Sequence, residues 1–268
     1  MAFTLIIVGG GRMGSALAEG LLKAKWCQAS ELALIESLPE QRAVLEARLP
    51  GVSVMAAIDP QDVDAKTGAV LSVKPDHAEN AARAVGASGV TRMLSVVAGM
   101  STARLEAVFP GPAAVIRSMP NTPVLVGKGA SAIAGGSNVT SEDLDWAQSI
   151  LGSVGLVVRV TERHLDVVTG LSGSMPAYLY LVIEALIEAG VHQGLSREVS
   201  RQLVVATFEG SAALLSETGE SPEELRAQVT SPGGTTAAGL RVLENRAVRA
   251  AFLDAVASAA ERSRQLGR

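Results

Sequence analysis

The sequence predicts an α/β fold, in which an N-terminal domain with a doubly wound, mostly parallel sheet is followed by a C-terminal all-α domain. Short apolar runs alternate with helical stretches from Phe3 to about Val160. A glycine-rich segment follows the first of these runs directly, and after Thr161 the periodicity is helical only. Alternating strands and helices are typical of βαβ units, which place their strands side by side in a parallel sheet.

Seven apolar runs in the first part of the chain are typical of buried strands. They are rich in Val, Ile and Leu, and several are apolar at every position, as strands covered on both faces are. Helical patterns such as Ser15–Lys23 and Pro39–Arg48 fall between them. The predicted strands are Thr4–Val8, Glu31–Ile35, Gly68–Val73, Arg92–Val97, Ala113–Arg117, Gly129–Ala134 and Leu156–Val160.

The second part of the chain is predicted to be helical. Further helices are expected from Ser196 to Ser216 and from Asn245 to near the end. Because strand-like runs stop near Val160, we place the domain boundary there, with residues 1–160 as the sheet domain and 161–268 as the helical domain. One helix has a broad apolar face made by residues at i, i+3, i+4, i+7 and i+8, namely Leu179, Val182, Ile183, Leu186 and Ile187.

Composition excludes several classes of protein. With 48% apolar and 19% charged residues, the chain can bury a real core and is not disordered. The net charge of −4 and the lack of a Lys/Arg run give no reason to expect nucleic acid or a membrane as a partner. Cys27 is the single cysteine, and the three scattered histidines match no metal spacing. The apolar start is too short to span a membrane, so we expect a cytoplasmic protein.

The glycine-rich segment predicts a dinucleotide site. The first glycine of a G-x-G-x-x-G motif allows a tight turn, the second lets a pyrophosphate approach the backbone, and the third lets helix and strand pack closely. Exposed amides and the helix dipole then favour the phosphate charge. A purely structural turn is the alternative. The segment consists of Gly9, Gly10, Gly11, Arg12, Met13 and Gly14.

Glu36 is the candidate reader of the adenosine ribose. It ends the second predicted strand, 22 residues after Gly14, and is followed by Ser37. A carboxylate at this place accepts hydrogen bonds from both ribose hydroxyls and repels a 2′-phosphate. No arginine follows immediately, and the nearest is Arg42. Glu36 therefore favours NADH over NADPH, although a solvated loop carboxylate is the simpler alternative.

Several further segments, which together cover nearly the whole chain, resemble pyrroline-5-carboxylate reductase. The resemblance implies an N-terminal Rossmann domain, and a C-terminal helical domain that interlocks with a second subunit. It implies an interlocked dimer, or a decamer of five dimers in a ring. The reaction implied is the NADH- or NADPH-dependent reduction of 1-pyrroline-5-carboxylate to L-proline, the last step of proline biosynthesis. The segments are Val229–Thr236, Ser72–Pro75, Val97–Met100, Arg117–Pro123, Asp166–Ser174 and Pro176–Tyr178.

The same resemblance implies which residues contact the cofactor. One group lies beside the nicotinamide ribose, a second flanks the nicotinamide pocket, and Glu162 at the domain junction touches the cofactor. Asp59 stands where the family often has Asn, and we expect it to bind the cofactor, as we expect of Ser37. The first group is Ser72, Val73, Lys74 and Pro75, and the second is Val97, Ala98 and Asn121.

A loop between two helical patterns is the candidate substrate site. Its two glycines permit a tight backbone that points successive amides inward, and the following helix adds its dipole, an arrangement that suits a carboxylate. We expect Thr236 to be catalytic, with its hydroxyl reaching the ring nitrogen, while a helix cap is the structural alternative. The resemblance assigns substrate binding to residues 231–236, and the candidates are Ser231, Gly233, Gly234, Thr235 and Thr236.

Alternatives remain open on the same residues. Met175 stands where the family usually has Gly, which adds bulk at the start of a helix facing the substrate. The chain is then either this reductase or another NAD(P)H-dependent imine or hydroxyacid reductase. A non-catalytic dinucleotide sensor is a further alternative. No metal and no acid–base dyad is expected, because a protonated imine is already electrophilic. Lys74 is expected to present its backbone to the cofactor.

Overall fold

The computed structural model describes residues 2–267, which form two compact units. The first unit runs as far as Ser174 and includes the chain again from Ala257, and the second unit is Met175–Val256. The predicted domain boundary near residue 160 stays a prediction. The sheet ends at Arg159, but residues 161–174 pack on it, because Leu165 is buried in one cluster with two alanines of the sheet.

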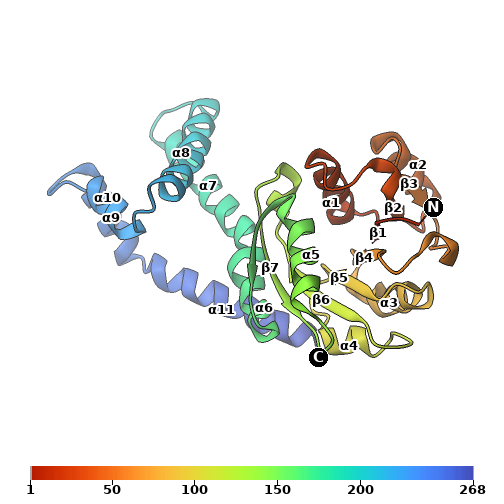
Figure 1. Cartoon of the computed structure of the whole chain (residues 1–268). Coiled ribbons are helices and arrows are strands. Elements are labelled where there is room, and N and C mark those ends of the chain that lie inside the picture. The colour runs from red at the N-terminus through yellow and green to blue at the C-terminus, as the bar shows by residue number, and fades with distance from the viewer. Residues whose placement is uncertain (1, 268) are drawn as a thin grey trace. The chain divides into compact units, whose positions relative to one another are not determined.

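The first unit is built on one eight-stranded sheet with the order β3-β2-β1-β4-β5-β6-β7-β8 (Figure 1). Strands β1 to β6 are parallel, β7 runs antiparallel to β6, and β8 is parallel to β7. The order of the first six is that of a Rossmann fold. The strands are β1 Leu5–Val8, β2 Leu32–Ile35, β3 Ser53–Met55, β4 Gly68–Leu71, β5 Arg92–Ser95, β6 Ala114–Met119, β7 Gly129–Gly135 and β8 Gly155–Arg159.

All seven predicted strands are confirmed, with ends that shift by one or two residues. The central strands β1, β2 and β4 are buried at every position, as their continuous apolar sequences require. The edge strand β3 was not predicted. It has only three residues, Ser53–Met55, all of them half-buried, and so short a segment carries no readable alternation.

Helices cover both faces of the sheet, as predicted for a doubly wound fold. One face packs against α1 (Arg12–Lys23), α2 (Pro39–Arg48) and α5 (Ser141–Gly152). The other face packs against α3 (Ala78–Ala87) and α4 (Thr102–Glu106). Because the strands are covered on both sides, the polar groups that matter for function gather where the strands end.

A third, smaller cluster lies where the sheet meets the helical part of the sequence. Ala132 and Ala134 of β7 pack against Leu165 of α6 (Leu165–Val168). A single π-helical turn, Thr169–Gly173, follows α6 near the end of this part of the first unit. This packing holds the carboxyl end of β8 and the start of α6 firmly on the sheet.

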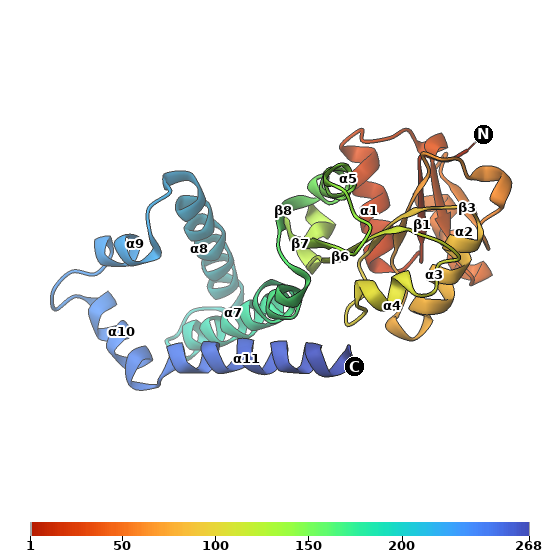
Figure 2. The same cartoon turned by 60° about the horizontal axis from the view of Figure 1, so that its bottom comes forward.

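The second unit is helical, as predicted (Figure 2). Helices α7 and α8 pack against each other and match two of the predicted helices. Helix α11 begins in this unit and continues into the first unit from Ala257. No residue of α7 is buried, and the predicted apolar face is half-buried or exposed. The helices are α7 Met175–His192, α8 Arg197–Thr218, α9 Pro222–Gln228, α10 Thr235–Asn245 and α11 Val248–Leu266.

Candidate active site

The turn between β1 and α1 can only be made by glycine at its first and third motif positions. Gly9 has a φ of +108°, and a Cβ atom there would lie 2.4 Å from the carbonyl oxygen of Ser72. A Cβ atom on Gly14 would lie 2.0 Å from the carbonyl oxygen of Gly9. Both distances are far below van der Waals contact, so the turn needs hydrogen at both positions.

Gly11, the second motif glycine, is open instead of crowded. Within the described residues, a Cβ atom on Gly11 would have no protein neighbour closer than 4 Å. Gly11 is the N-cap of α1, and no acidic side chain lies in the first turn of that helix. The free amides at this helix start therefore face space that an anionic group can occupy, as a pyrophosphate does in dinucleotide-binding turns.

The segment after β4 borders this turn and contains an unpaired hydroxyl. Ser72 Oγ is buried, and it has no hydrogen-bond partner among residues 2–267. Val73 beside it is half-buried, and Lys74 is the exposed N-cap of a short turn, Pro75–His77. A buried polar atom without a hydrogen-bond partner costs free energy. A bound cofactor is a natural source of such a partner for the Ser72 hydroxyl.

The Glu36 carboxylate is held beside the glycine turn by backbone hydrogen bonds. Its Oε2 accepts a hydrogen bond from the backbone N–H of Gly10 at 3.1 Å, and its Oε1 accepts one from the N–H of Leu38 at 3.0 Å. The hydroxyl of Ser37 donates to the same Oε1 at 3.4 Å. The turn and the carboxylate, 22 residues apart in sequence, therefore form one site at the end of β2.

Arg42 lies closer to this site than its sequence separation indicates. Its Nη1 donates to the backbone carbonyls of Glu36 and Ser37, both at 2.9 Å. The guanidinium is thus fastened to the backbone beside the carboxylate that we expect to read the ribose. The sequence signal was only an arginine in the first turns of α2, six residues after Glu36.

Two other predicted cofactor residues have local roles in the structure. Asp59 is exposed and caps the short turn Pro60–Asp62, with its Oδ1 accepting from the N–H of Gln61 at 2.9 Å. Asn121 links two segments, because its Oδ1 accepts from the N–H of Ala130 at 2.8 Å and its Nδ2 donates to the carbonyl of Ser172 at 3.2 Å. Their contact with a cofactor stays a prediction.

The loop between β5 and α4, residues 96–101, contains two of the predicted nicotinamide contacts, Val97 and Ala98. Val97 is buried in the core beneath the loop, whereas Ala98 is exposed. Gly99 has a φ of +75°, in the left-handed region that favours glycine. The loop therefore presents Ala98 outward while its neighbours hold it to the sheet.

The Glu162 carboxylate is bound by Thr102 and lies beside Arg117. Its Oε1 accepts from the backbone N–H of Thr102 at 2.7 Å, and its Oε2 accepts from the Thr102 hydroxyl at 2.8 Å. The guanidinium of Arg117 lies 3.5 Å from Oε1. Thr102 and Arg117 were not predicted as site residues. Arg117 begins the family-like segment Arg117–Pro123, whereas no sequence signal pointed to Thr102. The contact of Glu162 with a cofactor remains a prediction.

The predicted substrate loop lies in the second unit and forms a tight turn. The N–H of Gly234 donates to the carbonyl of Ser231 at 3.0 Å, and Gly233 has a φ of +70°. A proline at the second position and a left-handed glycine at the third are typical of a type II turn. Gly234 is the N-cap of α10, without a side-chain cap.

Thr235 and Thr236 are therefore the first two residues inside α10 and not its caps. The first amides of α10 have no acceptor within the helix, so the helix start can bind a carboxylate. Met175 is the first residue of α7 in the same unit.

Neither the cysteine nor a metal cluster adds a further reactive site among residues 2–267. Burial and the nearby Glu31 carboxylate raise the pKa of the Cys27 thiol to about 11, so this cysteine is not a nucleophile near neutral pH. Among the described residues, no group of three or more His, Cys, Asp or Glu side chains is placed to hold a metal ion.

Comparison with known proteins agrees with this arrangement. Residues 4–99 match the family described as NADP oxidoreductase coenzyme F420-dependent, and residues 162–266 match pyrroline-5-carboxylate reductase dimerisation. The pyrroline-5-carboxylate reductase of Corynebacterium melassecola is 41% identical, over 99% of both chains. The chain belongs to the pyrroline-5-carboxylate reductase family. The Mycobacterium tuberculosis reductase is also 41% identical, over 98% of this chain and 96% of the relative.

Solved structures of the family have the same fold. The reductase of Coxiella burnetii has a TM-score of 0.91 at 29% identity and covers all of both chains. The Plasmodium falciparum pyrroline carboxylate reductase, solved with NADP bound, has a TM-score of 0.86 at 32% identity and covers 98% of both chains. The open helix start at Gly11 and the unpaired Ser72 hydroxyl fit a dinucleotide in this chain.

The glycine turn allows binding and folding to be separated by substitution. Gly14→Ala should lower the free energy of unfolding by at least about 2 kcal/mol, because its methyl group collides with the Gly9 carbonyl. Gly11→Ala should change it by less than about 0.5 kcal/mol and raise the cofactor Kd roughly tenfold or more, because the methyl group occupies space left for the pyrophosphate. Denaturant unfolding and fluorescence titration with NADH measure both. An unchanged cofactor Kd in Gly11→Ala would show that the pyrophosphate does not bind at this turn.

Proposed function

We propose that the chain reduces 1-pyrroline-5-carboxylate to L-proline with NADH or NADPH, the last step of proline biosynthesis. One observation carries the proposal. The chain combines a dinucleotide turn with the loop Ser231–Thr236, and that loop lies inside the region matched to the dimerisation domain of this family. A sensor that only bound the cofactor would have no use for the loop.

The cofactor half of the site is assigned to the carboxyl ends of the sheet strands. The turn 9–14 binds the pyrophosphate, Glu36 and Ser37 bind the adenosine ribose, and the segments 72–75 and 97–98 border the nicotinamide. When bound, the nicotinamide supplies the hydride for the C=N carbon. The chain orients this ring and keeps water from it, while Lys74, whose side chain is exposed, contributes its backbone.

The substrate half of the site is assigned to the loop 231–236. The free amides at the start of α10 bind the carboxylate of the imine, with the Ser231 and Thr235 hydroxyls as further donors. The Thr236 hydroxyl hydrogen-bonds the ring nitrogen and orients the imine. A protonated imine needs no further acid, so positioning is the main contribution of these residues, worth several kcal/mol in such reactions.

Two measurements separate this function from its competitors. Steady-state kinetics with pyrroline-5-carboxylate, pyrroline-2-carboxylate and small 2-keto acids should show the highest kcat/KM for the first. Growth of a proline auxotroph on expression of the chain would test substrate and direction together. A higher kcat/KM for a 2-keto acid would make the chain a hydroxyacid reductase, and cofactor binding without any turnover would make it a sensor.

We expect NADH to be preferred over NADPH. Glu36 repels a 2′-phosphate, whereas Arg42, fastened to the carbonyls of Glu36 and Ser37, attracts one. Glu36→Gln should therefore raise the ratio of kcat/KM for NADPH to that for NADH roughly tenfold, about 1.4 kcal/mol, and Arg42→Ala should lower it. Glu46→Gln is the control, because it removes an exposed carboxylate from α2, the helix that contains Arg42. A clear preference of the unaltered protein for NADPH would contradict the expectation.

Thr236→Ala tests the substrate site. Loss of the hydrogen bond to the ring nitrogen should lower kcat/KM roughly ten- to a hundredfold, about 1.4–2.8 kcal/mol, while the melting temperature stays nearly constant. Thr230→Ala is the matched control, because the Thr230 hydroxyl is already bound to the carbonyl of Arg226. A lowered melting temperature with normal turnover would assign Thr236 a structural role and leave substrate binding to Ser231 and the backbone amides.

Assembly of two chains accounts for the exposed apolar surface of the helical unit. The stretch Glu162–His192 is apolar and long enough to cross a membrane by length and composition alone. The π-helical turn Thr169–Gly173 interrupts this stretch, and the stretch lies in the region matched to the dimerisation domain of the family. We therefore assign its apolar face to a second chain in an interlocked dimer, or a decamer of such dimers, in the cytoplasm. We assign neither nucleic acid nor a membrane as a partner.

Light scattering at micromolar concentration should give a mass of at least twice the 27.5 kDa of one chain. Leu181→Glu should shift this mass toward the monomer, because Leu181 is 67% exposed on α7 and a charge there cannot be buried in an interface. Val44→Glu places the same charge on α2, where Val44 is 56% exposed, and should leave the mass unchanged. A monomeric unaltered protein would refute the dimer.

A further inference from the structure

Arg12 places a positive charge at the start of the first helix. It is the first residue of α1, and its side chain is exposed. Within residues 2–267, its guanidinium takes part in no ion pair and no hydrogen bond. A cation in the first turn of a helix lies at the positive end of the helix dipole, which lowers the stability of that helix. Arg12 is therefore in an unfavourable place as long as no anion is near it.

The other long helices of the sheet unit begin with the opposite charge. Helices α2, α3 and α5 carry Glu40, Glu79 and Glu142 in their first turns, where a carboxylate is stabilised by the dipole. Helix α1 has no acidic residue there. The cation at the start of α1 is thus a local departure from what favours folding, and such departures are expected at functional sites.

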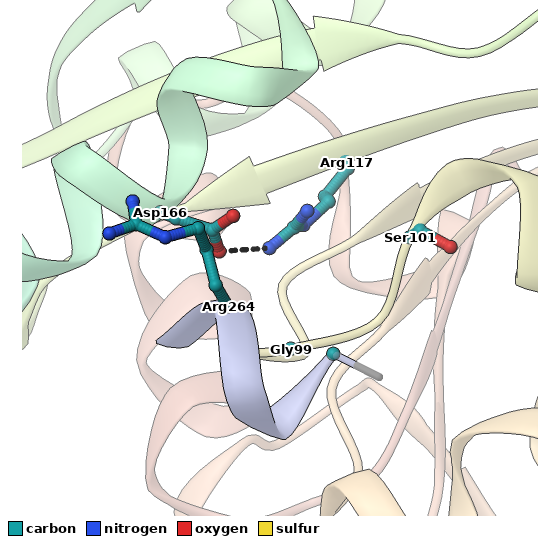
Figure 3. Close-up of a pocket in the computed structure, with 6 residues that line it drawn as sticks. Gly99, Ser101, Arg117, Asp166 and Arg264 are labelled. Carbon is teal, nitrogen blue, oxygen red and sulfur yellow. Dashed lines mark hydrogen bonds and ion pairs between the residues drawn. The ribbon is translucent and has the colours of Figure 1, made fainter. Parts of the chain in front are cut away.

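A second arginine near the carboxyl ends of the strands shows the usual arrangement. The side chain of Arg117 is only 9% exposed and lies 3.5 Å from both Glu162 Oε1 and Asp166 Oδ1. Figure 3 shows it pointing toward Asp166 beside a cavity of about 260 Å³. Two carboxylates of the protein compensate the charge of Arg117, whereas no group of the described chain compensates that of Arg12.

The charges around the glycine turn indicate what Arg12 binds. Glu36 accepts a hydrogen bond from the N–H of Gly10, so a negative charge lies beside this turn and uses one of its amides. The start of α1 contributes only about half a positive charge, and a pyrophosphate carries a negative charge on each phosphate. Side chains of a helix lean toward its N-terminus, so Arg12 leans toward the open space at Gly11.

We propose that the Arg12 guanidinium binds the pyrophosphate of the coenzyme and offsets the repulsion from Glu36. This inference rests on the proposed function, because it takes the glycine turn as the coenzyme site. A guanidinium can bind two phosphate oxygens at once. Since NADH and NADPH share the pyrophosphate, Arg12 sets how tightly either coenzyme binds, whereas Glu36 and Arg42 set the choice between them. The bound pyrophosphate also supplies the anion that the start of α1 lacks in the free protein.

Arg12→Gln tests this inference through binding and stability together. Fluorescence titration should show the Kd of NADH and that of NADPH each raised roughly tenfold, with their ratio kept within about twofold. Arg12→Lys keeps the charge and should restore most of the affinity. Without coenzyme, the melting temperature of Arg12→Gln should rise by roughly 1–2 °C, because a cation leaves the positive end of the helix dipole. A purely structural role for Arg12 predicts a lower melting temperature and an unchanged Kd.

Lys23→Gln is the matched control. It removes the same charge from the other end of α1, where Lys23 is exposed in the last turn. Both Kd values should stay unchanged. The melting temperature should fall slightly instead of rising, because a cation at this end of the helix is favourable.

Two fragments of the coenzyme locate the phosphate that Arg12 binds. ADP-ribose contains the pyrophosphate but no 2′-phosphate, and 2′-AMP contains the 2′-phosphate but no pyrophosphate. Arg12→Gln should weaken competition by ADP-ribose against NADH and leave competition by 2′-AMP unchanged. The reverse pattern, with only NADPH bound more weakly, would overturn the inference, as would an unchanged Kd for both coenzymes. An unaltered protein that binds NADH but does not reduce pyrroline-5-carboxylate would refute the proposed function, while the same titrations would still decide the role of Arg12.

Discussion

The close approach of the glycine turn to the end of β4 is the constraint on which the rest of the site depends. Gly9 leaves the central strand with a positive φ, and the Ser72 carbonyl occupies the place of its missing side chain. Gly14 then lets α1 pack against the same turn. Because this contact sets where α1 begins, it also decides where the free amides of that helix point, and therefore where we expect an anionic cofactor to bind.

The same turn is hydrogen-bonded to the carboxylate that we expect to discriminate between the two coenzymes. The N–H of Gly10 donates to the Glu36 carboxylate, so the group that we expect to read the ribose is oriented by the loop that we expect to bind the phosphates. Arg42 adds a cation fastened to the backbone of the same segment. Glu36 and Arg42 carry opposite charges, and both are held by the backbone of the same segment. A change of one of these side chains can therefore alter coenzyme choice in such a site while the fold stays the same.

Sequence patterns predicted the layers of this protein better than its contacts. Continuous apolar runs mark strands buried on both faces, and the glycine spacing marks the turn, because both are local requirements. The reversed direction of β7 was not predicted, since an apolar run reads the same in either direction. The partners of Glu162 were not predicted either. Thr102 begins α4 and lies 60 residues from Glu162, which is in the short turn before α6, so only the folded chain brings the two together.

The helical unit follows a different physical rule from the sheet. Since α7 buries none of its residues within the described chain, this unit cannot owe its stability to a core of its own. In the proposed dimer, cover by a second chain would make its folding and association one equilibrium, which depends on protein concentration. Helix α11 begins in this unit and ends in the sheet unit, where Ser263 binds Asp166. The sequence of α11 therefore serves both units, because its last turns supply one of the hydrogen bonds that hold Asp166.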